Sequence, residues 1–178
     1  VILWRRRKTI LLEKKFITPS LNNKNLVVKQ DIKKKYKLKY LKNLGQIKSL
    51  SLKIDAAFIC TPSKYHIDEA IWLIKNNINV FVEKPLGSNL KNISSLKNLI
   101  LKKKKIVHMM GYQLKFNPII NKVKEILDKN SIGQIYNIFV HHGEHINDFH
   151  PYEDYRISYA ARKDLGGGVI LCQIHELD

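Results

Sequence analysis

Two continuous apolar runs, with helical patterns between and after them, constrain the fold of this chain more than any other feature. Ala56 to Cys60 and Val80 to Val82 are typical of parallel strands that are buried on both faces. A third strand-like run covers Ile106 to Met110. Apolar residues at helical spacing fill the gaps, and these are Ile67, Ala70, Ile71 and Ile74, then Ile93, Leu96, Leu99 and Ile100. The order strand, helix, strand, helix, strand predicts an α/β domain with a Rossmann-like parallel sheet.

The flanking segments predict a second, different unit. Before the alternating region, Val1 to Trp4 reads as a strand, Lys37 to Tyr40 as a short edge strand, and Leu44 to Leu52 as a helix capped by Asn43. After it, Asn117-Pro118 opens a helix whose inner face carries Ile120, Val123, Ile126 and Leu127. Residues 135–142 alternate strictly, as a half-buried strand does, and Gly166 to Gly168 opens a further helix. We therefore divide the chain into residues 1–112, a truncated Rossmann-like domain with a parallel sheet, and residues 113–178, the beginning of an α+β domain.

The first residues also raise the expectation of a fragment. The chain opens without Met in the middle of a strand-like run, and it contains no glycine-rich turn of the G-x-G-x-x-G type. Such a turn places backbone N–H groups on a pyrophosphate. We expect the turn to lie upstream of Val1 and most of the second domain to lie downstream. On this interpretation the 178 residues alone bind dinucleotide poorly and are inactive.

The net charge of +17 invites a nucleic-acid interpretation, which the composition argues against. Of the 32 basic residues, 27 are Lys and five are Arg, and Ile (24) and Asn (15) are abundant with Lys, as codon bias towards A and T produces. Phosphate and base readers favour Arg, whose planar fork binds two acceptors. The sequence contains no run of about 18 apolar residues, so it predicts no membrane span. A signal peptide has positive charge before an apolar stretch, and the amino terminus has the opposite order. Two separate cysteines, Cys60 and Cys172, suit a reducing cytoplasm.

Chemically distinctive residues follow two of the predicted strands. Thr61-Pro62 ends the first apolar run, and Glu83-Lys84-Pro85 ends the second. In open parallel sheets, ligands bind beyond the carboxyl ends of the strands. The placement of these two segments therefore predicts a binding site at that edge of the sheet.

Four motifs, in order, resemble those of the Gfo/Idh/MocA family of NAD(P)-dependent oxidoreductases. They are Thr61-Pro62-Ser63-Lys64-Tyr65-His66 with Glu69-Ala70, Glu83-Lys84-Pro85-Leu86, Gly111-Tyr112-Gln113 with Phe116-Asn117-Pro118, and Asp164 to Gly168 with His175 to Asp178. The resemblance covers residues 54–178. It implies that residues 1–112 are a truncated dinucleotide-binding domain and that residues 113–178 are the beginning of a substrate and catalytic domain. It implies hydride transfer between NADP(H) or NAD(H) and a carbon of a sugar, cyclitol or nucleotide-sugar derivative. It also implies a small-molecule substrate and a homo-oligomeric full-length protein, with neither nucleic acid nor membrane as a partner.

The resemblance assigns roles to individual residues. Lys84 and His175 take the catalytic positions and also contact substrate, while Thr61, Pro62, His66, Glu83 and Gln113 take positions near the cofactor. Tyr155 and Arg156 lie in a segment that resembles a substrate-side loop, although a loop packed by its aromatic residues is an equal alternative. This chemistry requires an acid–base group. The group removes the proton of a hydroxyl while the hydride leaves, and it returns the proton in the reverse reaction.

One departure from the family pattern bears on activity. The family commonly has an Asp shortly before the catalytic His, and this chain has Cys172 there. A neutral thiol cannot orient an imidazolium as a carboxylate does. This leaves open a non-catalytic relative that senses a dinucleotide or a sugar, as the alternative to an enzyme.

Two further patterns concern the cofactor and metals. If Val1 to Trp4 is the second Rossmann strand, then Arg5 and Arg6, with Arg7, lie where a 2′-phosphate binds, which slightly favours NADP(H) over NAD(H); a solvated basic turn is nearly as good an explanation. His141, His142, His145 and His150 suggest a metal site. Strand alternation sends the first two to opposite faces, so we do not expect a metal.

Overall fold

The computed structural model describes residues 2–4, 12–13, 43–49, 51–149, 151 and 154–177. Several predictions fall on other residues. The edge strand at Lys37 to Tyr40, the arginines Arg5 to Arg7, His150 and Asp178 all lie outside the described residues.

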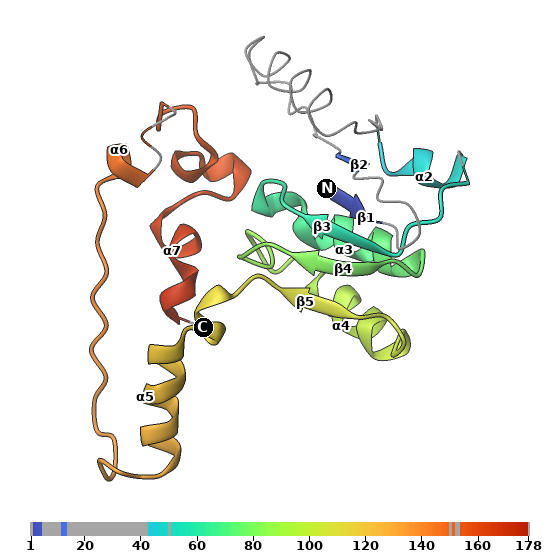
Figure 1. Cartoon of the computed structure of the whole chain (residues 1–178). Helices are drawn as coiled ribbons and strands as arrows, with labels where there is room; N and C mark the ends of the chain where they lie inside the picture. Colours follow the sequence, from blue (N-terminus) through green and yellow to red (C-terminus); the bar gives the residue numbers. More distant parts are fainter. Residues whose placement is uncertain are drawn as a thin grey trace.

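A five-stranded sheet in the order β2-β1-β3-β4-β5 forms one side of the molecule (Figure 1). Strands β3 (Ala56–Ile59), β4 (Asn79–Val82) and β5 (His108–Met110) run parallel, so the predicted Rossmann-like core is confirmed. Strand β1 (Ile2–Trp4) pairs antiparallel with both β3 and β2 (Leu12–Glu13). Its carboxyl end therefore faces the sheet edge opposite to the carboxyl ends of β3 to β5. The expectation that Val1 to Trp4 forms a parallel second Rossmann strand is corrected accordingly.

Two helices cover one face of the parallel strands. Helix α3 (His66–Lys75) joins β3 to β4, and helix α4 (Ile93–Lys102) joins β4 to β5. Since adjacent parallel strands are joined by right-handed crossovers, both helices lie on the same face, where they contact each other. Ala57, Ile59, Leu73 and Ile74 are almost completely buried at this interface, and Leu96 reaches it from α4. The predicted inner face of α3 is thus confirmed. That of α4 is confirmed at Leu96, Leu99 and Ile100, whereas Ile93 is exposed.

The strands are not buried on both faces, contrary to the expectation from their continuous apolar runs. Phe58 and Phe81 point away from the helices, and their rings pair at 5.5 Å between centroids. Phe58 is exposed and Phe81 is half-buried among the described residues. Alternate residues of β3 and β4 therefore divide between a helix-covered face and an aromatic face.

The short helix before the sheet follows its prediction. Helix α2 (Gly45–Ser49) is three residues shorter at its end than predicted, and the Asn43 side chain accepts a hydrogen bond from the Gln46 backbone N–H at 3.2 Å. Ile47 is its buried residue and joins the main core. Within the described ranges, no helix combines the length and the apolar character needed to cross a bilayer.

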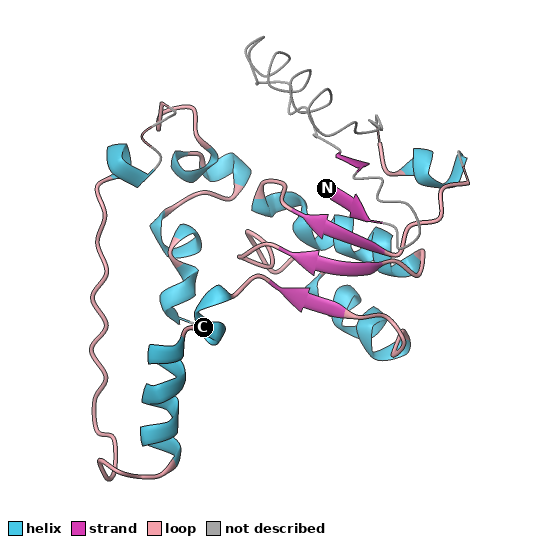
Figure 2. Cartoon of the chain, viewed as in Figure 1, coloured by secondary structure: helices cyan, strands magenta, loops and turns pink. Residues whose placement is uncertain are grey.

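The residues after β5 form an arm that leaves the sheet and returns to it (Figures 1 and 2). Helix α5 (Pro118–Asp128) begins where predicted, with Asn117 accepting from the Ile119 N–H at 2.8 Å. Its predicted inner face is not buried, because Ile120 and Val123 are exposed. The arm continues through α6 (Ile146–Phe149) and ends in α7 (Val169–Cys172) and the 3-10 helix η5 (Ile174–Leu177).

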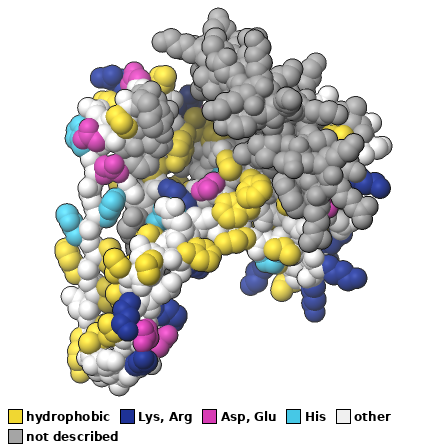
Figure 3. Space-filling view, in the orientation of Figure 1, with side chains coloured by type: hydrophobic (Ala, Val, Ile, Leu, Met, Phe, Trp, Pro, Cys, Tyr) yellow, Lys and Arg dark blue, Asp and Glu magenta, His cyan; other side chains and the backbone are white. Residues whose placement is uncertain are grey.

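The strand predicted at residues 135–142 is wrong. The segment is drawn out between α5 and α6 without regular secondary structure (Figure 2). Tyr136 and Phe139 are 88% and 85% exposed. An alternating segment becomes a strand only where a neighbouring strand accepts its hydrogen bonds, and no described strand pairs with it. Hydrophobic side chains consequently gather on the surface of this arm (Figure 3).

Candidate active site

A cavity of about 410 Å³ opens beside the carboxyl ends of β4 and β5. It is lined by two predicted catalytic residues, two predicted cofactor residues and a group of apolar and aromatic neighbours. These are Phe81, Glu83, Lys84, Met109, Met110, Gly111, Tyr112, Gln113, Phe116 and His175. The apolar members form one part of the wall, and the polar side chains come from a strand end, a turn and a 3-10 helix. Residues 91 positions apart in the sequence, Lys84 and His175, thus share one cavity.

Lys84 enters the cavity from the turn that follows β4. Its Nζ donates a hydrogen bond to the backbone carbonyl of Cys172, at 2.5 Å. An ammonium group has three N–H donors and no acceptor, so this bond leaves two donors for other partners. The contact also ties the end of β4 to helix α7, across a long sequence separation.

His175 reaches the same cavity from η5, directly after α7. Its imidazole ring meets the Tyr112 ring edge-on, with centroids 6.2 Å apart and planes at 85°. Edge-to-face contacts of this kind hold an aromatic ring at a defined angle. Tyr112 follows β5, so the contact joins the third parallel strand to the end of the arm.

The glycine turn before α7 fits closely against the sheet domain. Ser63, which is 2% exposed, donates from its hydroxyl to the Gly166 carbonyl at 3.1 Å. A Cβ on Gly166 would meet the Ser63 Oγ at 2.1 Å, and Gly166 has a φ of +86°. A Cβ on Gly167 would meet the Tyr159 carbonyl oxygen at 2.1 Å. Both positions therefore require glycine, and the turn places α7 where its carbonyl meets Lys84.

An ion pair braces the segment just before this turn. The Arg162 guanidinium donates through Nε and a terminal nitrogen to the two carboxylate oxygens of Asp164, at 3.1 and 2.6 Å. The hydrogen bond from Arg162 holds the pKa of the Asp164 carboxyl below its usual range. Asp164 is consequently ionised and engaged on the surface, outside the 410 Å³ cavity.

The end of β3 is held by the first turns of α3. The Thr61 hydroxyl donates to Glu69 Oε2 at 2.8 Å. The His66 ring is 1% exposed, with Nε2 2.6 Å from the Thr61 carbonyl oxygen and Nδ1 2.7 Å from the Pro85 carbonyl oxygen. The side chains of Thr61 and His66 and the Thr61 carbonyl are thus engaged inside the protein.

The structure brings together only some of the predicted site residues. Lys84, His175, Glu83 and Gln113 line the cavity, whereas Thr61, Pro62 and His66 do not. Cys172 is 7% exposed and lines a separate cavity of about 140 Å³, so it contributes its carbonyl, and not its thiol, to the Lys84 side. The cofactor roles of Thr61, Pro62 and His66 stay predictions.

Tyr155 and Arg156 lie apart from these residues. The Arg156 guanidinium sits 5.0 Å from the centre of the Tyr155 ring and 3.5 Å from Asp154 Oδ1, and neither residue lines the 410 Å³ cavity. This arrangement is that of a turn packed on itself. Their predicted substrate role is not tested by it.

Sequence reasoning missed the apolar part of the site. Phe81, Met109 and Met110 line the cavity, yet each belongs to an apolar run that also reads as ordinary core. The available signal was the alternation along β4 and β5, because one face of each strand must lie away from the helices.

Cys60, at the end of β3, reports the electrostatics near this edge. Partial burial raises the pKa of its thiol, and the negative charge of Glu83 raises it further. The thiol is exposed and unpaired in the structure. Glu83 therefore contributes its charge beside the strand end as well as lining the cavity.

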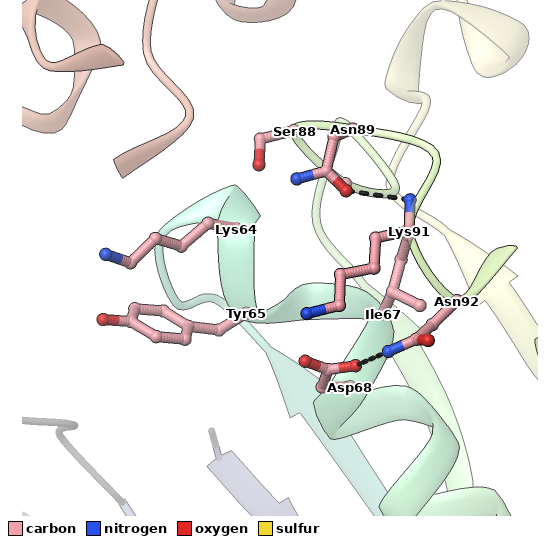
Figure 4. Close-up of a pocket in the computed structure, with 9 residues that line it drawn as sticks. Lys64, Tyr65, Ile67, Asp68, Ser88, Asn89, Lys91 and Asn92 are labelled. Carbon is pink, nitrogen blue, oxygen red and sulfur yellow. Dashed lines mark hydrogen bonds between the residues drawn. The ribbon is translucent and has the colours of Figure 1, made fainter. Parts of the chain in front are cut away.

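A second, polar hollow of about 250 Å³ lies between the start of α3 and the loop after β4 (Figure 4). Lys64 and Tyr65 extend from one side of it, and Lys91 and Asn92 from the other. Asn92 donates to Asp68 Oδ1 at 2.7 Å across it. No predicted site residue lies in this hollow, and it is separate from the cavity that holds Lys84.

The described histidines between α5 and α6, which are His141, His142 and His145, belong to no group of the size that a metal site needs. His141 stacks on Phe139, with ring planes 3° apart. In the part of the chain that the structure describes, no group of three or more His, Cys, Asp or Glu side chains could hold a metal ion.

Comparison with known proteins decides the family. The sequence model of the GFO_IDH_MocA oxidoreductase family, NAD-binding Rossmann fold, matches residues 16–112. The chain belongs to this family. The match contains β3, α3, β4, α4 and β5 and excludes β1, in agreement with the antiparallel placement of that strand.

Individual relatives give the range of chemistry in the family. The chain is 25% identical over 118 residues to a trans-1,2-dihydrobenzene-1,2-diol dehydrogenase of Xenopus tropicalis, covering 66% of this chain and 33% of the relative. It is 31% identical over 81 residues to the scyllo-inositol 2-dehydrogenase (NAD(+)) of Bacillus subtilis, covering 46% and 23%. The chain thus spans about a third or less of the length of these curated relatives.

Solved structures share the fold. The myo-inositol 2-dehydrogenase from Lactobacillus plantarum superposes with a TM-score of 0.55 at 24% identity, covering 65% of this chain and 33% of that one. The scyllo-inositol dehydrogenase from Lactobacillus casei, solved with NAD(H) and scyllo-inositol, gives 0.53 at 24%, covering 61% and 32%.

Proposed function

We propose that the protein transfers a hydride between a nicotinamide dinucleotide and a carbon of a sugar, cyclitol or nucleotide-sugar derivative. The observation that carries this proposal is the shared cavity of Lys84 and His175 at the carboxyl ends of the parallel strands. Membership of an oxidoreductase family with an NAD-binding fold supports it. Relatives named as inositol dehydrogenases support the substrate class.

The volume and the lining of the cavity support a nicotinamide ring as its ligand. Its volume of about 410 Å³ lies within the ordinary range of small-molecule sites. At Gly111, an added Cβ would lie 3.2 Å from the Phe81 ring and 3.3 Å from Glu83 Oε1. A side chain at this position would therefore crowd the cavity. We propose that Glu83, Gly111 and Gln113 hold the ring, which when bound accepts or supplies the hydride.

The polar residues of the cavity can then manage the proton. In oxidation, the substrate O–H proton passes to His175 while the C–H bond gives up its hydride and the C=O bond forms; reduction reverses each step. Lys84 keeps one N–H on the Cys172 carbonyl and presents the others to the substrate oxygen, where its positive charge stabilises the developing negative charge.

A steady-state assay tests the proposal. The purified full-length protein is assayed with NAD⁺ and NADP⁺ against a panel of cyclitols and sugars, and reduced cofactor is followed by absorbance. Replacing Lys84 by Met should lower kcat/KM by at least about 100-fold, as loss of an acid–base or electrostatic group does. Lys64→Met, at an exposed lysine of the other hollow, is the matched control. Equal turnover by both variants would reject the role of Lys84.

A sensor that binds without turnover is the second candidate. Cys172, at the position where the family resemblance implies an Asp, is the observation that favours it. Binding of dinucleotide or cyclitol by calorimetry, with no turnover by the wild type or by Cys172→Asp, would favour the sensor. Measured turnover by the wild type would reject it.

The finer properties are also proposals. NADP(H) as the slightly favoured cofactor now rests on the positive charge of Arg5 and Arg6 alone, because β1 pairs antiparallel with β3 and is not the parallel second Rossmann strand. A clear NAD⁺ preference in the assay would overturn it. We also propose that the chain divides into two domains at residue 112, where the family match ends. We propose a cytoplasmic location, which suits the two unpaired cysteines, and a homo-oligomeric assembly.

A further inference from the structure

His66 has an unusual environment at the junction of two strand ends. The ring is 1% exposed, and each of its nitrogens faces a backbone carbonyl oxygen. Nε2 lies 2.6 Å from the Thr61 oxygen, at the end of β3. Nδ1 lies 2.7 Å from the Pro85 oxygen, in the turn after β4. One buried ring therefore bridges the two turns that carry the family motifs.

Both hydrogen-bond partners of this ring are acceptors. The ring therefore needs a proton on each of its two nitrogens to bond to both. A neutral imidazole has one N–H and one bare nitrogen, and the bare nitrogen cannot bond to a carbonyl oxygen. Only the imidazolium donates from both nitrogens. Distances of 2.6 and 2.7 Å are also those of charge-assisted hydrogen bonds. A neutral ring would leave a buried carbonyl facing a lone pair, which is costly.

The side chain of Glu69 holds the same threonine as this ring. Glu69 follows His66 by three residues in α3, so the two side chains share one face of the helix. Glu69 is also buried, and its Oε2 accepts the hydrogen bond of the Thr61 hydroxyl at 2.8 Å. Thr61 is thus held twice, through its carbonyl by His66 and through its hydroxyl by Glu69.

We propose that His66 is held as an imidazolium and acts as a positioning residue for Lys84. Lys84 immediately precedes Pro85, so the bond from Nδ1 restrains the backbone from which the lysine side chain departs. The bond from Nε2 fixes that backbone relative to the end of β3. Together they set the direction of the lysine towards the Cys172 carbonyl and the cavity. The catalytic consequence rests on the proposed function, whereas the charge state does not.

Nitrogen NMR tests the charge state without any assay of activity. The ¹⁵N-labelled protein is examined at about pH 7.5, where an exposed histidine is mostly neutral, and the His66 signals are identified by their loss in His66→Asn. We expect both ring nitrogens to be of the protonated type, each coupled to a slowly exchanging N–H proton. One protonated nitrogen and one bare nitrogen would overturn the proposal.

Two conservative variants test the positioning role. The amide nitrogen of Asn can replace Nδ1 and donate to Pro85, while that of Gln can replace Nε2 and donate to Thr61. If the Pro85 bond positions Lys84, then His66→Asn should retain kcat within about threefold, and His66→Gln should lower it by at least about tenfold with little change in KM. Equal kcat in both variants, at equal thermal stability, would reject the positioning role.

The two readouts separate this inference from the proposed reaction. A protein without turnover that shows both N–H protons keeps the imidazolium and rejects the reaction. Turnover together with a bare ring nitrogen rejects the imidazolium and keeps the reaction. If either variant fails to fold, the NMR result on the wild-type protein still decides the charge state.

Discussion

Replacing Gly166 by Ala should undock the end of the arm from the sheet. Gly166 has a φ of +86°, and an alanine in this left-handed conformation costs about 1–2 kcal/mol. Its Cβ would lie 2.1 Å from Ser63 Oγ and 2.7 Å from Ser88 Cβ, which is overpacking of a kind that costs about 1–3 kcal/mol. The displaced Ser63 would lose its hydrogen bond to the Gly166 carbonyl, worth about 0.5–1.5 kcal/mol. The expected loss is therefore about 3–6 kcal/mol.

Gly133→Ala is the matched control. Gly133 also has a positive φ, of +72°, but no atom lies within 4 Å of the position that a Cβ would take there. Only the backbone strain of about 1–2 kcal/mol remains at this site. Urea unfolding of the two variants should therefore differ by about 2–4 kcal/mol, and amide exchange at Gly168 and Cys172 should accelerate in Gly166→Ala alone.

A double variant checks the cause of the loss. Ser63→Ala removes the oxygen that the new Cβ would meet, so Ser63→Ala with Gly166→Ala should be more stable than the sum of the single changes predicts. Equal free energies of unfolding for Gly166→Ala and Gly133→Ala would refute the close fit between the glycine turn and the sheet domain.

Three further predictions address other parts of the molecule. Because Glu83 raises the pKa of the Cys60 thiol, Glu83→Gln should lower that pKa and speed the alkylation of Cys60 at a fixed pH below it. Slow alkylation of the buried Cys172 is the internal reference, and an unchanged rate at Cys60 would contradict the coupling to Glu83. Cys172→Ser should retain kcat within a few-fold, because the Lys84 acceptor is a backbone oxygen, and a loss above about 100-fold would show that the thiol itself is required. Phe139→Lys should weaken any concentration-dependent association seen by sedimentation, because residues 135–140 form an exposed apolar segment without charge or proline. Asn121→Lys is the control for the added charge, and an equal effect of that variant would attribute the change to net charge.

The sheet core could be predicted because its elements are local. Strands β3 and β4 and helix α3 each carry their own apolar pattern, and the residues at the strand ends then follow from topology alone. For this reason the apolar pattern alone places Lys84 at the correct edge of the sheet. The same logic fails for β1, because an apolar run states nothing about the direction in which a strand pairs.

The arm could not be predicted in the same way. The alternation of residues 135–142 describes the side chains of a strand, but strand formation depends on a partner that local sequence does not specify. The contacts of Lys84 with the Cys172 carbonyl and of Ser63 with Gly166 join residues 88 and 103 positions apart through backbone atoms. Backbone acceptors leave no trace in residue identity, so only the glycines hinted at them.

The position of Cys172 between two cavities has a consequence for inhibition. Its carbonyl accepts the hydrogen bond of Lys84, which lines the larger cavity. Cys172 itself lines the smaller cavity together with Ile146 and Val169. A compound that fills the smaller cavity and shifts this residue would move the partner of Lys84 as well. The reaction site could thus be reached by a ligand that never competes with substrate or cofactor.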